Sequence, residues 1–321
     1  MCALFGWLDY KGIVPYKILK KLTQALANAA EERGTDASGI SYVSDGKITI
    51  YKRPKPAHKL RFNIPVDTKA VMGHTRMATQ GDKSQNFNNH PFSGTTGDIS
   101  FAFAHNGVLW NDKELRHDKK LPDTHIRTDS YIAVQLLESQ NKLNFDSLRY
   151  MAETVEGNFT FTVLDQNNSL YIIKGSNPMC LLHFESLGLY IYASTESIMK
   201  NALRKVGLYK FASEKIEVVE GNILCINKTG EITRSEFEAK LYRSKYMSWY
   251  GNDEPYYGVH EGLLLAYCGC YGVDSSDVEL LLEYGYTCDE IEDMLMDYDL
   301  IHETVRVVKG EDCYDDLLME M

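Results

Sequence analysis

The second residue of the chain, Cys2, carries a thiol next to the backbone amine that removal of Met1 would expose. Aminopeptidases normally remove a first methionine that precedes a small residue, so we expect Cys2 to carry a free α-amine. The thiol could then act as a nucleophile, and the amine, with a pKa of about 7.7–8.0, could accept the thiol proton. The alternative is that Cys2 is only a small apolar residue at the start of a buried strand.

Three polar segments further along contain residues suited to binding a small charged substrate. Arg76, in GHTRMATQG, has a planar charged fork that matches a carboxylate, although it could also form a surface ion pair. In HNG, the Asn106 amide and the Gly107 N–H could form an oxyanion hole, but Asn-Gly is also the commonest hairpin dipeptide. Asp129, in RTDS, could bind an ammonium group or cap a helix.

The hydrophobic pattern predicts short strands separated by turns, with helices between them. The expected strands are Cys2–Leu8, Gly39–Val43, Lys47–Lys52, Ala70–Gly73, Ser100–Ala104, Phe159–Leu164, Leu170–Ile173, Leu189–Ala193, Lys215–Val219 and Ile223–Ile226. Helical spacing is found in Pro15–Arg33, Asp129–Ser139, Phe145–Val155 and Thr195–Val206. Ser44-Asp45-Gly46 indicates a hairpin turn. We therefore expect an α+β fold with two mainly antiparallel sheets and helical layers outside them.

Charge divides the chain near residue 245. Residues 246–321 contain 19 acidic and 2 basic residues, a net charge of −17, whereas the remainder contains 26 acidic and 32 basic residues, a net charge of +6. We expect a first domain at 1–245 and a small acidic helical extension at 246–321, with capping boxes at Ser276–Glu279 and Thr287–Glu290. The acidic extension would repel phosphates, which argues against nucleic-acid binding.

The cysteines and the apolar runs indicate a cytoplasmic protein. Seven cysteines without dense spacing favour free thiols, and no apolar run is long enough for a membrane span. The N-terminus lacks a basic region followed by an apolar stretch, so we do not expect a secretory signal. Zinc could in principle be bound by Cys268, Cys270, Cys288, Cys313, His260 and His302. Because paired C-x-x-C elements are missing, we expect buried or free thiols there, and no metal.

Six motifs in order carry a resemblance to a known family. Cys2, RGTDASG (33–39), GHTRMATQG (73–81), NNHPF (88–92), HNG (105–107) and RTDS (127–130) together resemble the class II glutamine amidotransferase domain, of the N-terminal-nucleophile hydrolases. The resemblance covers roughly residues 2–238. It implies a four-layer αββα sandwich and hydrolysis of the glutamine side-chain amide through a thioester, giving glutamate and ammonia without a cofactor.

The catalytic roles that the resemblance implies fall on three residues. Cys2 attacks the amide carbon of glutamine, and its own α-amine moves the proton. Asn106 and the N–H of Gly107 stabilise the tetrahedral oxyanion. Met77 stands where many members have a tryptophan, which helps to gate the ammonia path in hexosamine-forming members.

The resemblance also implies how glutamine is held. Arg76, helped by Thr79, binds the α-carboxylate, and Asp129 binds the α-ammonium. These roles agree with the residue chemistry, since a zwitterion needs one cation and one anion held apart. The remaining motif residues are expected to support the site from a second layer or as scaffold: His74, Arg33, Asp36 and His90.

The extension at 246–321 is too short for a sugar isomerase, a phosphoribosyltransferase or an ATP-dependent synthetase domain. We therefore expect the ammonia acceptor on a partner protein or on a second copy of the chain, with the extension as a docking element or as a cap on the sandwich. An alternative function is a non-catalytic regulatory module that binds an amino acid or a protein. A third is hydrolysis of another small amide by Cys2.

Overall fold

The computed structural model describes residues 2–238, 264–265, 268, 273–295 and 298–309. The chain divides into two compact units, Met1–Tyr242 and Arg243–Met321. The first unit contains two antiparallel sheets, and the described part of the second contains helices. In the part of the chain that the structure describes, no helix combines the length and the apolar character that a membrane crossing needs.

One sheet of the first unit has seven strands in the order β11-β9-β10-β1-β4-β2-β3, all of them antiparallel to their neighbours. Their bounds are β1 (Ala3–Asp9), β2 (Ala37–Ser44), β3 (Lys47–Arg53), β4 (Ala70–Arg76), β9 (Cys180–Phe184), β10 (Leu189–Ala193) and β11 (Glu214–Ile216). Strand β1 lies between β10 and β4, so the segment that directly follows Cys2 is paired on both sides.

The other sheet has six antiparallel strands in the order β13-β12-β8-β7-β6-β5. Their bounds are β5 (Phe92–Thr96), β6 (Ile99–Leu109), β7 (Gly157–Asp165), β8 (Leu170–Lys174), β12 (Asn222–Ile226) and β13 (Ile232–Glu236). The long pairing of β6 with β7 runs from Phe101 opposite Asp165 to Leu109 opposite Gly157.

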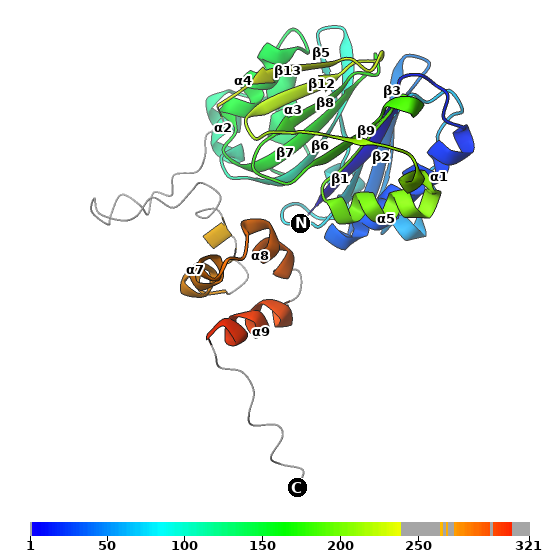
Figure 1. The fold of residues 1–321 in the computed structure, drawn as a ribbon. Coiled ribbons are helices and arrows are strands. Elements are labelled where there is room, and N and C mark those ends of the chain that lie inside the picture. Colours follow the sequence, from blue (N-terminus) through cyan, green and yellow to red (C-terminus); the bar gives the residue numbers. More distant parts are fainter. Residues whose placement is uncertain (1, 239–263, 266–267, 269–272, 296–297, 310–321) are drawn as a thin grey trace. The chain divides into compact units, whose positions relative to one another are not determined.

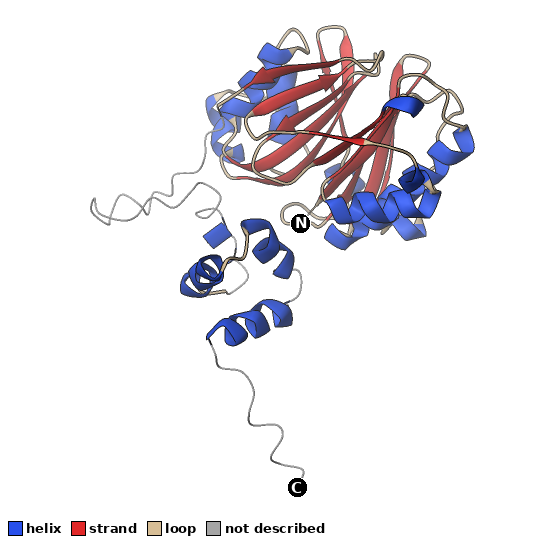
Figure 2. Ribbon diagram, in the orientation of Figure 1, coloured by secondary structure: helices blue, strands red, loops and turns tan. Residues whose placement is uncertain are grey.

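Helices cover the outer face of each sheet (Figure 1; Figure 2). The seven-stranded sheet packs against α1 (Tyr16–Ala29) and α5 (Glu196–Val206), and the other sheet packs against α3 (Tyr131–Glu138), α4 (Phe145–Thr154) and the short α2 (Asp112–Asp118). Strand β1 shows how the sequence makes these layers. Phe5 and Trp7 point to the helices, and Leu4 and Leu8 enter the core between the sheets. The predicted αββα sandwich is confirmed.

The sequence pattern missed several elements. The edge strands β5 and β13, strand β9 between β11 and β10, and helix α2 were not expected. In β5 the inward positions are held by Phe92, Gly94 and Thr96, which give a weak apolar signal, and β13 is mostly exposed. Helix α2 buries only Leu115. The hairpin predicted between β2 and β3 is confirmed, with Asp45 and Gly46 both at positive φ.

The HNG segment is not where the sequence analysis put it. A strand was expected to end at Ala104, with a hairpin turn as one interpretation of Asn106-Gly107. Instead β6 continues to Leu109, and Asn106 and Gly107 pair with Thr160 and Phe159 of β7. The turn interpretation is therefore wrong, and these two residues are held inside a strand ladder.

The second unit contains α7 (Ser275–Tyr284), α8 (Cys288–Met294) and α9 (Tyr298–Lys309). Their apolar faces form a core of their own, which includes Cys268, Val278, Leu281, Ile291, Ile301 and Val305. The capping box at Thr287–Glu290 is confirmed. The one expected at Ser276–Glu279 is wrong, because Asp274 is the N-cap of α7 and accepts from the N–H of Ser276.

Candidate active site

Cys2 directly precedes β1, and its side chain is partly exposed. Its Sγ donates to the carbonyl oxygen of Met77 at 3.5 Å. Nε of Arg33, in the short 3₁₀ helix that follows α1, donates to the carbonyl oxygen of Cys2 at 3.0 Å. The backbone of Cys2 is therefore held from one side, and its thiol faces the segment that follows β4.

The surroundings of the Cys2 thiol disfavour its ionised form. Burial raises its pKa above the usual value, and the positive charge of Arg76 only partly opposes that effect. A thiol of this kind needs a base to become a thiolate.

A small pocket lies beside Cys2. Its cavity volume is about 10 Å³, close to the volume that one water molecule requires. The lining consists of Cys2, Arg76, Met77, Thr79, Gln80, His90, His105, Gly107, Thr128, Asp129 and Ser130. Strands β4 and β6 and the segment before α3 thus bring their motifs to one place, although they are far apart in the sequence.

Most of the residues selected from the sequence meet in this pocket. Those in the lining are Cys2, Arg76, Thr79, Gly107, Asp129 and His90. Those outside the lining are Asn106, His74, Arg33 and Asp36. The sequence analysis did not select Gln80, His105, Thr128 or Ser130. Each of them is next to a selected residue in the same motif. Selecting every residue of each motif would therefore have found them.

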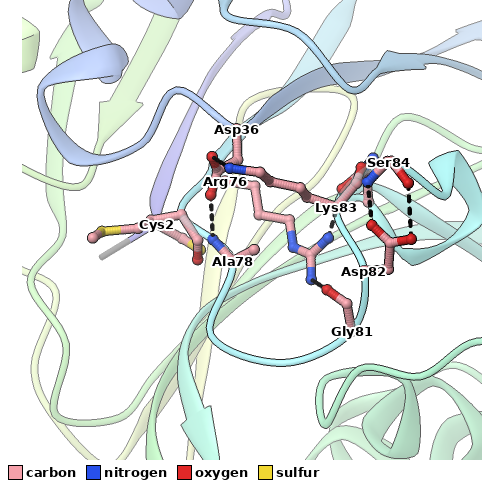
Figure 3. A network of polar contacts seen from close by, with 10 residues as sticks. Cys2, Asp36, Arg76, Ala78, Gly81, Asp82, Lys83 and Ser84 are labelled. Carbon is pink, nitrogen blue, oxygen red and sulfur yellow. Dashed lines mark hydrogen bonds and ion pairs between the residues drawn. The ribbon is translucent and has the colours of Figure 1, made fainter.

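Arg76 is the last residue of β4, and its side chain is buried. Nη1 donates to Oδ1 of Asn89 at 2.7 Å. Nη2 donates to the carbonyl oxygens of Gln80 and Gly81, the latter at 3.1 Å. The guanidinium thus points into the loop that follows β4 and is bonded to its backbone (Figure 3). A surface ion pair, one interpretation of Arg76, is wrong because the side chain is buried.

Asp36 holds that loop at two points. One carboxylate oxygen accepts from the N–H of Ala78 at 2.9 Å, and the other accepts from Nζ of Lys83 at 2.5 Å (Figure 3). Burial alone would raise the pKa of Asp36, but these two bonds outweigh it and the pKa lies below the usual value. The ionised Asp36 therefore anchors residues 78 and 83 on either side of Thr79, Gln80 and Gly81.

Asn106 and Gly107 have the properties that an oxyanion hole needs. Asn106 is buried, and neither polar atom of its side-chain amide has a partner among the described residues. Such a group is costly unless a ligand completes it. Gly107 has φ +138°, and a Cβ there would lie 2.0 Å from the carbonyl oxygen of Asn158, so only glycine fits. Nδ2 of Asn177 donates to the carbonyl oxygen of Asn106 at 2.8 Å.

Asp129 is the anion of the pocket. Oδ2 accepts from the N–H of Leu109 at 2.7 Å, and the hydroxyl of Ser130 donates to Oδ1 at 3.4 Å. Burial raises the pKa of Asp129. The bond to Leu109 ties this carboxylate to the end of β6, two residues beyond Gly107.

Three histidines near the pocket are uncharged. Burial lowers the pKa of His74 and of His105 to about 3, and burial lowers that of His90 well below its usual range. Nε2 of His74 donates to the carbonyl oxygen of His105 at 3.0 Å, and Nδ1 of His105 lies 2.8 Å from the hydroxyl of Ser130. The rings of His74 and His90 lie 4.3 Å apart. His74 and His105 are therefore packing and hydrogen-bonding residues, and His90 packs through its ring. Their lowered pKa values make all three weak bases at neutral pH.

The described residues contain no group of three or more His, Cys, Asp or Glu side chains arranged to hold a metal ion. Of the cysteines and histidines considered for zinc, Cys270, Cys313 and His260 lie outside the described residues. Cys268 belongs to the core of the second unit.

Comparison with known proteins agrees with this geometry. The family model "Glutamine amidotransferases class-II" matches residues 1–157. Glutamine–fructose-6-phosphate aminotransferase (isomerizing) of Chlamydia trachomatis is 30% identical over 189 residues, which are 57% of this chain and 30% of that protein. The enzyme of the same name from Staphylococcus aureus is 25% identical over 274 residues, which are 83% of this chain and 42% of that protein. The chain thus spans less than half of the length of these relatives.

Two solved structures share the fold. Glutamine phosphoribosylpyrophosphate amidotransferase from B. subtilis, in complex with ADP and GMP, superposes with a TM-score of 0.57 at 21% identity, over 74% of this chain and 49% of that chain. A structure described as the allosteric regulatory enzyme of purine biosynthesis gives a TM-score of 0.59 at 21% identity, over 83% of this chain and 57% of that one. The first unit of this chain therefore contains a class II glutamine amidotransferase domain, matched over residues 1–157, within a sandwich whose fold these two structures share.

Proposed function

We propose that this chain hydrolyses the side-chain amide of glutamine with Cys2 as the nucleophile, giving glutamate and ammonia. The observation that carries the proposal is that one pocket joins a thiol, a guanidinium and a carboxylate, from Cys2, Arg76 and Asp129. Glutamine presents an amide, a carboxylate and an ammonium group, which are the three complementary groups.

In the first half of the reaction, the free α-amine of Cys2 takes the thiol proton, and the thiolate attacks the amide carbon. The unpartnered amide of Asn106 and the N–H of Gly107 stabilise the oxyanion that forms. The carbon–nitrogen bond then breaks, the α-ammonium returns its proton to the leaving nitrogen, and ammonia departs. A thioester between Cys2 and the glutamyl group remains.

In the second half, water attacks the thioester carbon while the α-amine accepts a proton from the water. The carbon–sulfur bond breaks, the proton returns to the sulfur, and glutamate leaves. The raised pKa of the Cys2 thiol supports the need for such a base. The low pKa values of His74 and His105 make them poor candidates for it.

Substrate binding requires a change in the loop after β4. The pocket has room for about one water molecule, and Nη2 of Arg76 is occupied by loop carbonyls. We propose that the glutamine carboxylate replaces the carbonyls of Gln80 and Gly81 on Arg76, with the exposed hydroxyl side chain of Thr79 as a further donor. Asp129 then binds the ammonium group.

The ammonia acceptor is proposed to lie on a partner protein or on a second copy of this chain. The relatives named above carry fructose 6-phosphate and phosphoribosylpyrophosphate in their names, and the chain spans only part of their length. We place the reaction in the cytoplasm, where a reducing environment would keep the Cys2 thiol available. Cys2, Cys180 and Cys225 are free thiols, which supports that location.

Intact-mass measurement with the glutamine analogue diazo-oxo-norleucine tests the proposal. The untreated protein should have the mass of the chain without Met1, and the treated protein should carry one adduct that is lost in Cys2→Ala. Cys288→Ala, which removes a half-buried thiol of the second unit, is the matched control and should label like the wild type. A folded wild-type protein that neither labels nor consumes glutamine would contradict the proposal and favour an amino-acid-binding regulatory module.

A further inference from the structure

Lys52 is a half-buried cation that the proposed reaction does not use. It is the residue before the last of β3, opposite Gly39 of β2, and its side chain leaves the seven-stranded sheet toward the segment that leads into β5. Nζ donates to the carbonyl oxygens of Asn89 at 2.5 Å and of Pro91 at 3.0 Å. It also lies 4.9 Å from the ring centre of Phe92. One ammonium group therefore holds the backbone of the NNHPF motif at two carbonyls.

Asn89 connects Lys52 to Arg76. Its backbone carbonyl accepts from Lys52, and its side-chain Oδ1 accepts from Nη1 of Arg76 at 2.7 Å. Its Nδ2 donates to the carbonyl oxygen of Lys83 at 3.0 Å, and the residue has no exposed surface. Lys52 thus helps to hold the backbone of Asn89, and the side chain of Asn89 in turn helps to hold the guanidinium of Arg76.

The charges point the same way. The charges of Lys52 and Arg76 interact, and Nζ of Lys52 donates to two neutral carbonyls rather than to a carboxylate. Burial, and then the charge of Arg76, lower the pKa of Lys52 to about 8. The negative charges of three carboxylates favour the charged form of Arg76: Asp36, Asp82 and Asp129. A carboxylate that arrives at Arg76 would add negative charge where two cations are close together.

We propose that Lys52 is a positioning residue for recognition of the substrate α-carboxylate, because its ammonium fixes Asn89 and Asn89 fixes the fork of Arg76. This inference rests on the proposed glutamine hydrolysis. Lys52 acts through Arg76 and touches neither the thiol nor the oxyanion residues, so its contribution belongs to carboxylate binding and not to the chemical steps.

The test compares substrates with and without the carboxylate. Lys52→Met keeps the apolar stem and removes the N–H donors. For this variant we expect kcat/KM for glutamine to fall about tenfold or more, mainly through KM, since the lost bonds involve a charged donor. For 4-aminobutanamide, which is glutamine without its α-carboxylate, kcat/KM should stay at the wild-type value. Lys52→Arg, which keeps charge and donors, should restore most of the preference for glutamine.

Controls separate positioning from folding. Lys47→Met removes an exposed lysine from the other end of β3 and should leave both substrates unaffected. Adding Lys52→Met to an Arg76→Ala variant should not lower glutamine selectivity further, because the group through which Lys52 acts is gone. If Lys52→Met does not fold, as judged by thermal melting, Lys52→Gln, which keeps one N–H donor, replaces it and should show a smaller change of the same kind.

Equal losses for glutamine and 4-aminobutanamide, or an unchanged preference in Lys52→Met, would overturn the positioning role. Failure of the wild type to hydrolyse either amide would instead overturn the proposed function. In that case the role of Lys52 is tested by calorimetric titration with L-glutamate and with 4-aminobutanoate, which lacks the α-carboxylate. Lys52→Met should weaken the binding of glutamate and leave that of 4-aminobutanoate unchanged. Equal affinity of the wild type and Lys52→Met for glutamate would again contradict the role.

Discussion

Nη2 of Arg76 donates a hydrogen bond of 3.1 Å to the backbone carbonyl oxygen of Gly81. The same nitrogen donates to the carbonyl of Gln80, so both of its protons are used within the protein. A carboxylate that is to be held by the fork of Arg76 therefore competes with the loop. The Asp36–Lys83 ion pair stabilises the form of the loop that competes.

Lys83→Met should for that reason strengthen the binding of L-glutamate. Loss of the ion pair destabilises the form of the loop in which its carbonyls occupy Arg76. A larger share of the protein is then able to bind the glutamate carboxylate. An exposed ion pair contributes at most about 1 kcal/mol, so the dissociation constant should fall by up to about fivefold. Calorimetric titration measures it. Weaker binding in the variant would show that the loop must stay where Lys83 holds it.

Cys2→Ala should abolish glutamine hydrolysis and leave the melting temperature close to that of the wild type. Cys2→Ser should retain little activity, because a hydroxyl is a poorer nucleophile at neutral pH. Release of glutamate and ammonia is measured side by side with a melting curve. Hydrolysis at the wild-type rate by Cys2→Ala would exclude the thioester mechanism.

Blocking the α-amine of Cys2 should lower kcat by about 100-fold or more, since an amide in its place cannot act as the base. A variant with an uncleaved N-terminal tag tests this. In the untagged protein, activity should rise as the α-ammonium loses its proton, around pH 7.7–8.0 for an ordinary α-amine. His74 and His105, with pKa values of about 3, should add no further step between pH 5 and 8. Full activity of the tagged protein would point to another base.

Asn106→Ala and Arg76→Lys should affect different kinetic constants. Removal of the Asn106 amide should lower kcat by roughly 100- to 1,000-fold, as expected for an oxyanion donor. Arg76→Lys should raise KM, because an ammonium cannot replace the two-pronged contact or the bonds to Asn89 and the loop. Steady-state kinetics with glutamine measures both. If Asn106→Ala changed KM alone, the oxyanion role would be wrong.

Deletion of residues 246–321 should leave a soluble protein that still hydrolyses glutamine. The helices α7, α8 and α9 have their own apolar core, so their removal should not open the core of the sandwich. If the extension is a docking element, the truncated chain should lose its partner in a pull-down, or its dimer mass in sedimentation. Unfolding or aggregation of the truncated protein would instead show that the extension covers apolar surface of the sandwich.

The sandwich could be predicted because its central strands are strongly apolar. Strand β1 alternates between two cores with large side chains such as Phe5, Trp7, Leu4 and Leu8, and this pattern is visible in the sequence. Edge strands such as β5 bury fewer apolar side chains, and pairing with β6 rather than local preference makes them strands.

The pocket could be predicted from the sequence only in part. The order of the motifs identified several residues that line it, including Cys2, Arg76 and Asp129, but not the bonds that those residues form. Local sequence could not show that Asn106 and Gly107 lie within a strand, because Asn-Gly favours a turn unless a partner such as β7 is available. It also could not show that loop carbonyls occupy Arg76, since this depends on a fold-wide arrangement of Asp36, Lys83 and Asn89.

The placement of Asn106 and Gly107 in the β6–β7 ladder has a consequence for thermal inactivation. Amides inside a paired strand exchange with solvent only through large openings of the structure, whereas loops open locally at small cost. The loop after β4 and the β6 segment with Asn106 and Gly107 should therefore lose their structure at different temperatures on heating. The loop after β4 would lose its order first and reversibly, while the Asn106 amide and the Gly107 N–H, the proposed oxyanion hole, would keep their spacing until the six-stranded sheet itself melts.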